Sequence, residues 1–302
     1  MNQHILLTGA TGMLGKDLIE ALLKKGNQVS VLSRKPVQIS GVKVFLWNVE
    51  KQEIDISCIE GVDSIVHLAG ENISTEKWTD KRKKEIIDSR VLSARLLFKT
   101  ISENENQVKH FISAAAIGFY GDQEEEILTE DSTAGKDFLA YSCEQWEHAA
   151  DQGKALGIRV VKIRTGVVLA KNGGALPAMA KPIQFFAGAP LGSGHQWVPW
   201  IHQHDITQIY LHALEDKSMN EAYNACAPFP VTNKTLTKAI AKHIHRPVWP
   251  FSVPAKVMKL ILGEMSAIVL NSNNTSAQKL LDTGFVFKYT QLDQALSDIY
   301  GS

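Results

Sequence analysis

Short apolar runs alternate with amphipathic stretches through the first half of the chain. Several runs are apolar at nearly every position, as expected of strands that are covered on both faces. The candidate strands are residues 4–7, 28–32, 42–46, 64–68, 110–113 and 159–163. Between them, apolar residues recur at three- and four-residue spacing, which predicts helices over residues 13–25, 80–102 and 138–155. This alternation is typical of βαβ units and predicts an α/β protein with a doubly wound parallel sheet.

The pattern changes after Arg164, where glycines and prolines divide the chain into loops. Loops between scaffold elements are where substrate contacts usually lie. The longest glycine- and proline-rich loops fall within residues 171–204. A helix is predicted over residues 206–214, with Asp205 as its N-cap, and another over 231–245, followed by shorter ones. We therefore predict a larger domain at residues 1–229, with substrate loops at 171–204, and a smaller C-terminal lobe at 230–302.

The composition excludes several classes of function. The 302 residues include 32 Lys and Arg and 32 Asp and Glu, so the formal net charge is zero. A chain without net charge has no overall field that attracts phosphates, so we expect neither a nucleic-acid partner nor a membrane bound through bulk charge, although a local basic patch stays open. No apolar run is long enough to span a bilayer and no export signal is visible, so we expect a cytoplasmic protein. Three widely spaced cysteines without C-x-x-C predict reduced thiols and no metal site.

The strongest local signal is the segment TGATGMLG, which follows the first predicted strand and opens the first predicted helix. Its glycines are Gly9, Gly12 and Gly15, in the spacing G-x-x-G-x-x-G. Glycines at such a turn let backbone N–H groups approach a pyrophosphate, which then lies at the positive end of the helix. The alternative is a glycine-rich turn that binds nothing.

The residues after the second predicted strand indicate which dinucleotide is bound. An NAD site usually has Asp or Glu there, whereas this chain has Ser33, Arg34 and Lys35. A guanidinium can pair with a 2′-phosphate, which a carboxylate would repel, so the sequence predicts NADP rather than NAD. The alternative is that Arg34 and Lys35 form a solvated turn before Pro36.

An arginine lies on the apolar stripe of the predicted helix 80–102. Arg90 shares this stripe with Ile86 and Ala94, so its guanidinium is expected to point inward and needs a partner. Either a nearby carboxylate such as Glu85 or an anionic group of the cofactor could be that partner. His67, near the end of the fourth predicted strand, is interpreted as a packed core histidine rather than a catalyst.

Several of these motifs together resemble the extended short-chain dehydrogenases/reductases: TGATGMLG, SRKP, HLAGENI, KEIIDSR, ISAAAIGFYGD and RTGVVLAKNGGAL. The later motifs GSGHQWVPWIHQHD, NACAPFPVTNKTL, LGEMSAIVL and GFVFKY are similar to epimerase-family proteins, related to nucleotide-sugar epimerases, that carry their own C-terminal domain. The resemblance covers essentially the whole chain. It implies a Rossmann-like sheet with NADP bound across it and a smaller lobe that closes over the nicotinamide end.

The resemblance also implies roles for individual residues. The pyrophosphate is assigned to Gly9, Thr11, Gly12, Met13, Leu14 and Gly15, and the 2′-phosphate to Ser33 and Arg34. The ribose is expected along Leu68, Ala69 and Gly70, with Glu85 and Arg90 on the helix beside the cofactor and Val168 near the nicotinamide.

The chain departs from the wider superfamily in its catalytic residues. Those enzymes combine Tyr-x-x-x-Lys with a Ser or Thr, the lysine cation lowering the pKa of the tyrosine. Tyr141 matches the tyrosine, but Gln145 replaces the lysine and Ala115 stands at the hydroxyl position, leaving Ser113 as the nearby candidate. Without a cation Tyr141 is a poor base, although it could donate a proton, or Lys136 or Arg164 could supply the charge. The alternative is that Tyr141 is only an amphipathic residue at a helix start.

These features favour an NADP-dependent oxidoreductase or epimerase-like enzyme acting on a small carbonyl, alcohol or nucleotide-sugar substrate. His195 and His202 are candidate substrate contacts, and Tyr141 is the expected proton donor. We expect a monomer or homodimer. The alternative, supported by Ala115 and Gln145, is an NADP-binding sensor or scaffold whose chemistry has lapsed.

Overall fold

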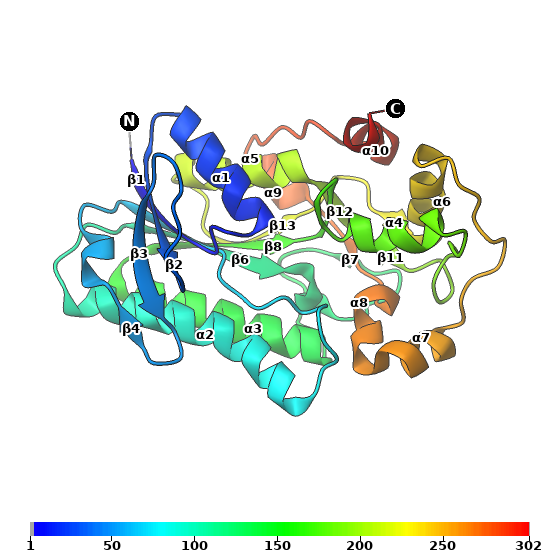
Figure 1. The fold of residues 1–302 in the computed structure, drawn as a ribbon, viewed down its shortest axis with the longest axis horizontal. Coiled ribbons are helices and arrows are strands. Elements are labelled where there is room, and N and C mark those ends of the chain that lie inside the picture. The colour runs from blue at the N-terminus through cyan, green and yellow to red at the C-terminus, as the bar shows by residue number, and fades with distance from the viewer. Residues whose placement is uncertain (1–2, 302) are drawn as a thin grey trace.

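An eight-stranded sheet occupies the centre of the larger part of the molecule (Figure 1). A computed structural model describes residues 3–301. The strands lie in the order β13-β8-β6-β5-β1-β2-β3-β4, and all neighbours are parallel except β3 and β4. Their bounds are β1 His4–Thr8, β2 Gln28–Ser33, β3 Lys43–Asn48, β4 Glu53–Ile54, β5 Ser64–His67, β6 His110–Ala116, β8 Arg159–Thr165 and β13 Glu221–Ala225. The six predicted strands are thus all present, each within three residues of its expected ends.

Helices cover both faces of this sheet (Figure 1). Helices α1 (Met13–Lys24) and α5 (Gln203–Glu215) pack on one face, and α2 (Asp80–Glu103) and α3 (Phe138–Asp151) pack on the other. Alternation along β1 supplies both cores, because Leu7 joins the cluster with α1 while Leu6 joins the cluster with α2. The prediction of a doubly wound α/β sheet is confirmed.

Side-chain caps explain where two of these helices begin. The Thr79 hydroxyl accepts from the Arg82 N–H to start α2, and the Asp137 carboxylate accepts from the Ala140 N–H to start α3. Helix α3 ends earlier than predicted because residues 152–156 tighten into a 3₁₀ turn that stops at Gly157, which has a φ of 73°.

The predicted cap of α5 is wrong. Its N-cap is His202, whose Nδ1 accepts from the His204 N–H at 3.0 Å, and the helix begins at Gln203. Asp205 is instead buried, and its carboxylate accepts from the backbone N–H groups of Lys288 and Tyr289 at 2.9 and 3.0 Å. The Tyr289 donor is buried and the Lys288 donor partly so, and their acceptor comes from a residue more than 80 positions earlier.

A second lobe lies beside the carboxyl ends of the sheet strands (Figure 1). Its remaining elements are β9 Val167–Ala170, β10 Gly173–Gly174, β11 Trp197–Val198, β12 Trp200–His202, β14 Val231–Thr232, α4 Leu176–Gln184, α6 Asn233–His243, α7 Ala255–Leu262, α8 Ala267–Leu270 and α10 Leu292–Tyr300. One core joins Leu176 and Trp200 to Leu236 and Leu296, so the lobe combines segments from both sides of residue 229. The boundary at 229 and 230 stays a prediction.

The last segments of the chain return to the larger part. Strand β15 (Asn274–Thr275) pairs with β7 (Ile127–Leu128), and Leu280 of α9 (Gln278–Asp282) packs into the core beneath α1 and α5. The cysteines Cys58, Cys143 and Cys226 are all buried and free. Within residues 3–301, no helix is both long and apolar enough to cross a bilayer.

Candidate functional site

The turn from β1 into the first turn of α1 leaves room only for glycine at two positions. Gly9 has a φ of 68°, and a Cβ added there would lie 2.7 Å from the Leu68 carbonyl oxygen. A Cβ added to Gly15 would lie 2.5 Å from the Gly9 carbonyl oxygen. The inner side of this turn is therefore packed tightly against the end of β5. Only its solvent-facing side has room for a ligand.

The N-terminus of α1 at this loop carries no cap of its own. Gly12 is the N-cap and makes no side-chain hydrogen bond, and the first turn contains no acidic residue. Thr11 and Gly12 are exposed. The backbone N–H groups of Met13 and Leu14, in the first turn, therefore remain for an anion, the arrangement that suits a pyrophosphate.

A buried hydrogen-bond chain ties β1 to β5 beside this loop. The Thr8 hydroxyl accepts from the N–H groups of Leu68 and Ala69, both at 3.1 Å, and so donates its proton to His67 Nδ1 at 2.8 Å. His67 Nε2 is thereby left to donate to Ser93 Oγ at 3.1 Å, and burial lowers the His67 pKa to about 4. His67 is thus a neutral core residue, as predicted, and it positions Leu68 and Ala69.

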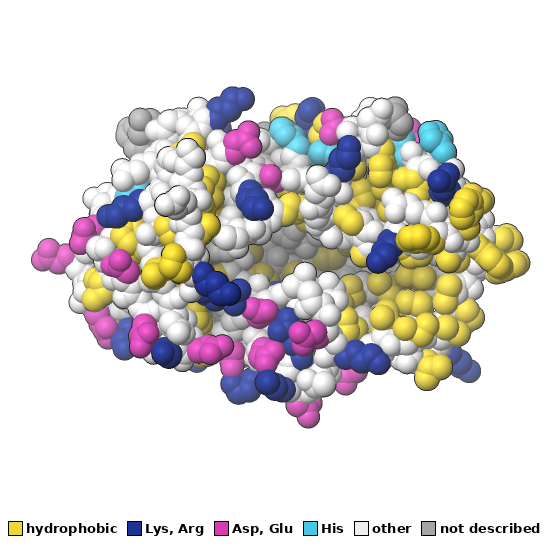
Figure 2. All heavy atoms as spheres, viewed as in Figure 1, with side chains coloured by type: hydrophobic (Ala, Val, Ile, Leu, Met, Phe, Trp, Pro, Cys, Tyr) yellow, Lys and Arg dark blue, Asp and Glu magenta, His cyan; other side chains and the backbone are white. Residues whose placement is uncertain are grey.

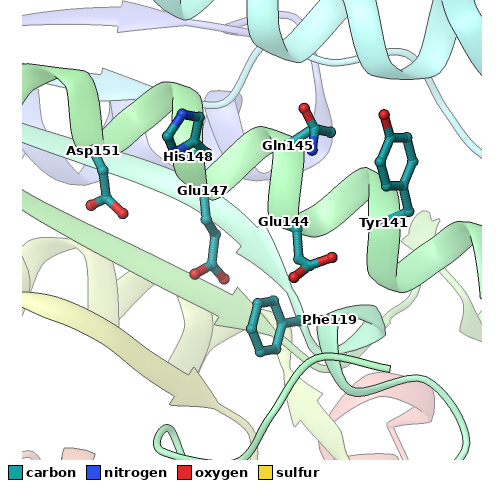
Figure 3. A pocket seen from close by; sticks show the side chains of 7 residues that line it. All are labelled: Phe119, Tyr141, Glu144, Gln145, Glu147, His148 and Asp151. Atoms are coloured by element: carbon teal, nitrogen blue, oxygen red, sulfur yellow. The ribbon is translucent and has the colours of Figure 1, made fainter. Parts of the chain in front are cut away.

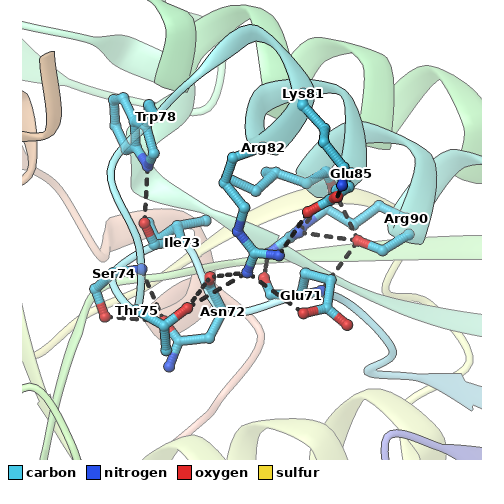
Figure 4. Close-up of polar contacts among 12 residues, drawn as sticks. Glu71, Asn72, Ile73, Ser74, Thr75, Trp78, Lys81, Arg82, Glu85 and Arg90 are labelled. Carbon is cyan, nitrogen blue, oxygen red and sulfur yellow. Dashed lines mark hydrogen bonds and ion pairs between the residues drawn. The ribbon is translucent and has the colours of Figure 1, made fainter.

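An ionic network crosses the carboxyl end of β1 from β2 to β5. Arg34, which follows β2, donates to Glu71, which follows β5, at 2.9 Å. Arg82 of α2 lies 3.4 Å from the other Glu71 oxygen and donates to Glu85 at 3.0 Å (Figure 4). The hydrogen bond from Arg34 holds the pKa of the Glu71 carboxyl below its usual value. The Arg34 side chain is 75% exposed, whereas Ser33 turns back to donate to the Lys35 carbonyl.

Arg90 is held by backbone carbonyl groups rather than by Glu85. Its guanidinium donates to the carbonyl oxygens of Ile86 at 2.9 Å and Glu71 at 3.0 Å, and it stacks 4.7 Å from the Trp146 ring centroid. Among residues 3–301 no carboxylate forms an ion pair with Arg90. Glu85, the expected partner, pairs with Arg82 instead. A Cβ on Gly70 would lie 3.0 Å from the Arg90 guanidinium carbon, so Arg90 packs closely against the loop after β5.

The structure brings two of the three predicted catalytic residues together, Tyr141 and Gln145 of α3. Tyr141 and Gln145 project from the same side of α3, and both line one open pocket with Phe119, Glu144 and Glu147 (Figure 3). The Tyr141 side chain is 52% exposed, and within the described part of the chain its hydroxyl makes no hydrogen bond. Ser113 is buried in β6 and donates to the Ala114 carbonyl.

The face of α3 that packs against the sheet carries different residues. A Cβ on Gly118, in the turn that directly follows β6, would lie 3.4 Å from Leu139 Cβ and 3.6 Å from Cys143 Sγ. Leu139 and Cys143 are therefore the i, i+4 pair that faces the carboxyl end of β6. Burial raises the pKa of the Cys143 thiol to about 12. This pair was missed, although its position on the apolar stripe of the predicted helix could have indicated it.

Arg164 supplies no free charge to Tyr141. Its Nε and Nη2 donate to the two carboxylate oxygens of Glu147 at 2.7 and 3.0 Å, and its Nη1 donates to the Tyr120 hydroxyl at 2.8 Å. The guanidinium carbon also lies 3.6 Å from the Phe119 ring centroid. Lys136, the other candidate, is exposed.

The lobe segment predicted near the nicotinamide reaches the phosphate loop. Val168 accepts at its carbonyl from the Ala175 N–H at 3.0 Å, which folds β10 back toward α1, and a Cβ on Gly173 would lie 2.7 Å from Met13 Sδ. His195 is exposed. His202 is buried, caps α5 and packs with its ring centroid 4.0 Å from that of Tyr289, the rings tilted by 38°, and burial lowers its pKa to about 4.

Comparison with known proteins gives consistent matches over nearly the whole chain. Residues 5–226 match the model of the NAD dependent epimerase/dehydratase family, and residues 253–299 match a domain of unknown function, DUF1731. The epimerase family protein YfhF of Bacillus subtilis is 36% identical over 98% of this chain and 97% of its own.

Two solved structures with similar folds support the same family assignment. The human epimerase family protein SDR39U1, solved with NADPH, is 29% identical over 99% of both chains, with a TM-score of 0.87. A nucleoside-diphosphate sugar epimerase from Corynebacterium glutamicum is 34% identical, covering all of this chain and 59% of that one, with a TM-score of 0.81. The glycine loop, the parallel sheet and these matches lead to one conclusion: the chain is a member of the NAD dependent epimerase/dehydratase family, with the fold of the extended short-chain dehydrogenases/reductases.

Proposed function

We propose that this chain binds NADP and acts as an oxidoreductase or epimerase-like enzyme on a small carbonyl, alcohol or nucleotide-sugar substrate. The uncapped N-terminus of α1 above the glycine loop carries this proposal, since its free N–H groups suit a pyrophosphate. Arg34 then lies at the end of β2, where a 2′-phosphate is expected. The human relative solved with NADPH and the bacterial sugar epimerase support the cofactor and the substrate class.

Arg34 can exchange its partner at little cost. Its ion pair with Glu71 is largely exposed, and such pairs contribute about 1 kcal/mol or less. A 2′-phosphate offers more charge and a bidentate geometry. Glu71 would keep Arg82 as its partner, so the network stays satisfied after Arg34 turns to the cofactor.

We expect NADPH to bind more tightly than NADH, and Arg34→Ala to weaken NADPH binding by about 10- to 100-fold, the value of a lost hydrogen bond to a charged group. NADH binding should change little. Fluorescence titration of both nucleotides checks this, with Lys35→Ala as the matched control for removing one exposed cation. Tighter binding of NADH, or an equal effect of Lys35→Ala, would contradict the proposed cofactor.

The bound cofactor would supply a hydride donor or acceptor at nicotinamide C4. The chain's own contribution is the proton, for which Tyr141 is the proposed donor and Gln145, one turn along α3, its proposed partner. Ser113 is not proposed as a partner, because it is buried in β6 and donates to the Ala114 carbonyl. Tyr141 is exposed and unpaired within the described residues, so a substrate hydroxyl or carbonyl would reach it through the open pocket that Tyr141 and Gln145 line with Phe119. Val168 is the proposed nicotinamide neighbour.

A second function, an NADP-binding sensor or scaffold without catalysis, is favoured by the inner face of α3. Leu139 and Cys143 occupy the positions that face the end of β6, and Cys143 is neutral at pH 7 because burial raises its pKa to about 12. Neither residue can move a proton to an alkoxide or hold a phenolate by charge. Proton-transfer groups are therefore lacking on this face.

Building the missing groups distinguishes the two functions. If the protein has lost catalysis, Leu139→Tyr with Cys143→Lys should create NADPH-dependent reduction of a panel of carbonyl compounds that the parent does not reduce. The matched control is Ala115→Ser with Gln145→Lys, which places the lysine on the side of α3 that carries Tyr141. If the parent itself turns over a substrate and Tyr141→Phe loses this activity, the protein is an enzyme that uses Tyr141. Circular dichroism confirms that each variant is folded.

A further inference from the structure

The C-terminal lobe exposes a cluster of large apolar side chains, which we term the lobe patch. It consists of Phe185, Phe186, Trp249, Phe251, Leu260 and Ile261, and all six are exposed. Figure 2 shows hydrophobic side chains gathered over the lobe, next to the central hollow and continuing to the outer edge. Monomeric soluble proteins rarely expose contiguous apolar surface of this kind without a binding role.

The exposure follows from how the lobe patch is built. The segment after α4 is joined to residues 245–254, because the Trp249 indole donates to the Phe186 carbonyl at 2.8 Å and the Trp249 N–H donates to the Gly188 carbonyl at 2.9 Å. These bonds hold both phenylalanines and Trp249 at the surface. Helix α7 follows directly, and none of its residues is buried, so its apolar side chains have no core to enter.

The two segments that build the lobe patch carry charge of one sign, and Glu264, just after α7, pairs with Lys83 of α2. Residues 171–204 and 222–263 contain eight Lys and Arg and no Asp or Glu, so the rest of the chain, with 24 Lys and Arg against 32 Asp and Glu, carries a net charge of −8. Arg246 lies 5.2 Å from the Phe186 ring centroid, and Lys256 and Lys259 belong to α7 itself. These three cations are exposed and form no ion pair among the described residues.

We propose that the lobe patch docks the protein on the surface of an anionic phospholipid membrane. Tryptophan and phenylalanine beside lysine and arginine are the side chains that enter the headgroup region, with the rings at the acyl boundary and the cations on the lipid phosphates. A second copy of the chain fits less well, because a two-fold interface would bring two positive patches together. The zero net charge of the whole chain conceals this local asymmetry.

Co-flotation with vesicles tests the proposal. The full chain should float with vesicles of phosphatidylcholine containing 30% phosphatidylglycerol at low salt, and not with phosphatidylcholine alone. Phe185→Glu with Leu260→Glu should abolish flotation, since these side chains are 73% and 85% exposed. Val286→Glu is the matched control, because Val286 is also 85% exposed but lies outside the lobe patch.

A second pair of variants tests the charge. Lys256→Gln with Lys259→Gln should reduce the partition coefficient at least about tenfold, since each juxtamembrane cation is worth about 1 kcal/mol or a factor of about five. Lys24→Gln with Lys99→Gln, at two other exposed lysines, should leave it unchanged. Melting temperatures confirm that all variants fold.

Three outcomes would overturn the proposal. One is the absence of flotation with the anionic vesicles, and another is an equal loss in Val286→Glu. The third is a dimer in analytical ultracentrifugation that Phe185→Glu with Leu260→Glu converts to monomers, which would assign the lobe patch to self-association.

Discussion

Gly15→Ala should weaken NADPH binding by about a hundredfold or more. The added Cβ would lie 2.5 Å from the Gly9 carbonyl oxygen and 2.7 Å from Ala10 Cα, both backbone atoms that no rotamer change can move. Ordinary contact begins near 3.4 Å, so α1 must move away from the loop by about 0.9 Å. A displacement of about 1 Å in a preorganised site typically costs this much, and the overpacking should also destabilise the fold by about 1–3 kcal/mol.

Gly12→Ala distinguishes an effect on NADPH binding from an effect on stability. Gly12 has an ordinary φ of −71°, and its added Cβ meets only the Gly9 carbonyl oxygen, at 3.3 Å. This variant should therefore keep the melting temperature of the parent while the new methyl group obstructs a pyrophosphate at the N-terminus of α1. Calorimetric titration with NADPH and thermal unfolding measure the two effects. Unchanged NADPH affinity in Gly12→Ala would place the pyrophosphate elsewhere.

The glycine loop illustrates what the sequence predicts well. Its function depends on neighbours within about ten residues, and the flanking strand and helix follow from hydrophobic periodicity, so Gly9, Gly12 and Gly15 were placed correctly against α1. The sheet strands were found for the same reason. Strand β13 was missed because buried Asn224 interrupts its apolar pattern, and this asparagine accepts from the Tyr120 hydroxyl at 2.7 Å.

Long-range pairing explains where prediction from sequence failed. Asp205 has the local pattern of an N-cap, yet its carboxylate satisfies two N–H groups of the C-terminal segment. Glu85 was a reasonable partner for Arg90, but it pairs with Arg82, and Arg90 finds a carbonyl of the loop after β5. Tyr141 matches a motif by spacing, whereas its helix face depends on how α3 packs, and that packing turns Leu139 and Cys143 inward. The apolar stripe of the helix could have indicated the last of these, but no local pattern reveals the partners of Asp205 and Arg90.

Arg164→Met should lower the free energy of unfolding by about 3–5 kcal/mol, the usual result when one partner of a buried ion pair is removed. Both Arg164 and Glu147 are buried, and the guanidinium donates to both Glu147 oxygens and to the Tyr120 hydroxyl. Methionine fills similar space but leaves the Glu147 carboxylate without its bidentate partner. Lys162, which lies 3.6 Å from Glu147, is already paired with Asp151 at 2.8 Å and compensates only in part.

A double-mutant cycle isolates the pair from the packing around it. Glu147→Leu alone should also destabilise strongly, because it leaves the Arg164 charge buried, whereas Arg164→Met with Glu147→Leu should recover most of the loss by removing both charges. Urea unfolding of the four proteins gives the coupling energy. Additive losses would mean that the ion pair contributes nothing and that the cost lies in the Phe119 stacking and the Tyr120 hydrogen bond. A large coupling energy would show that Arg164 is fully engaged in joining β8 to α3 and has no charge to lend to Tyr141.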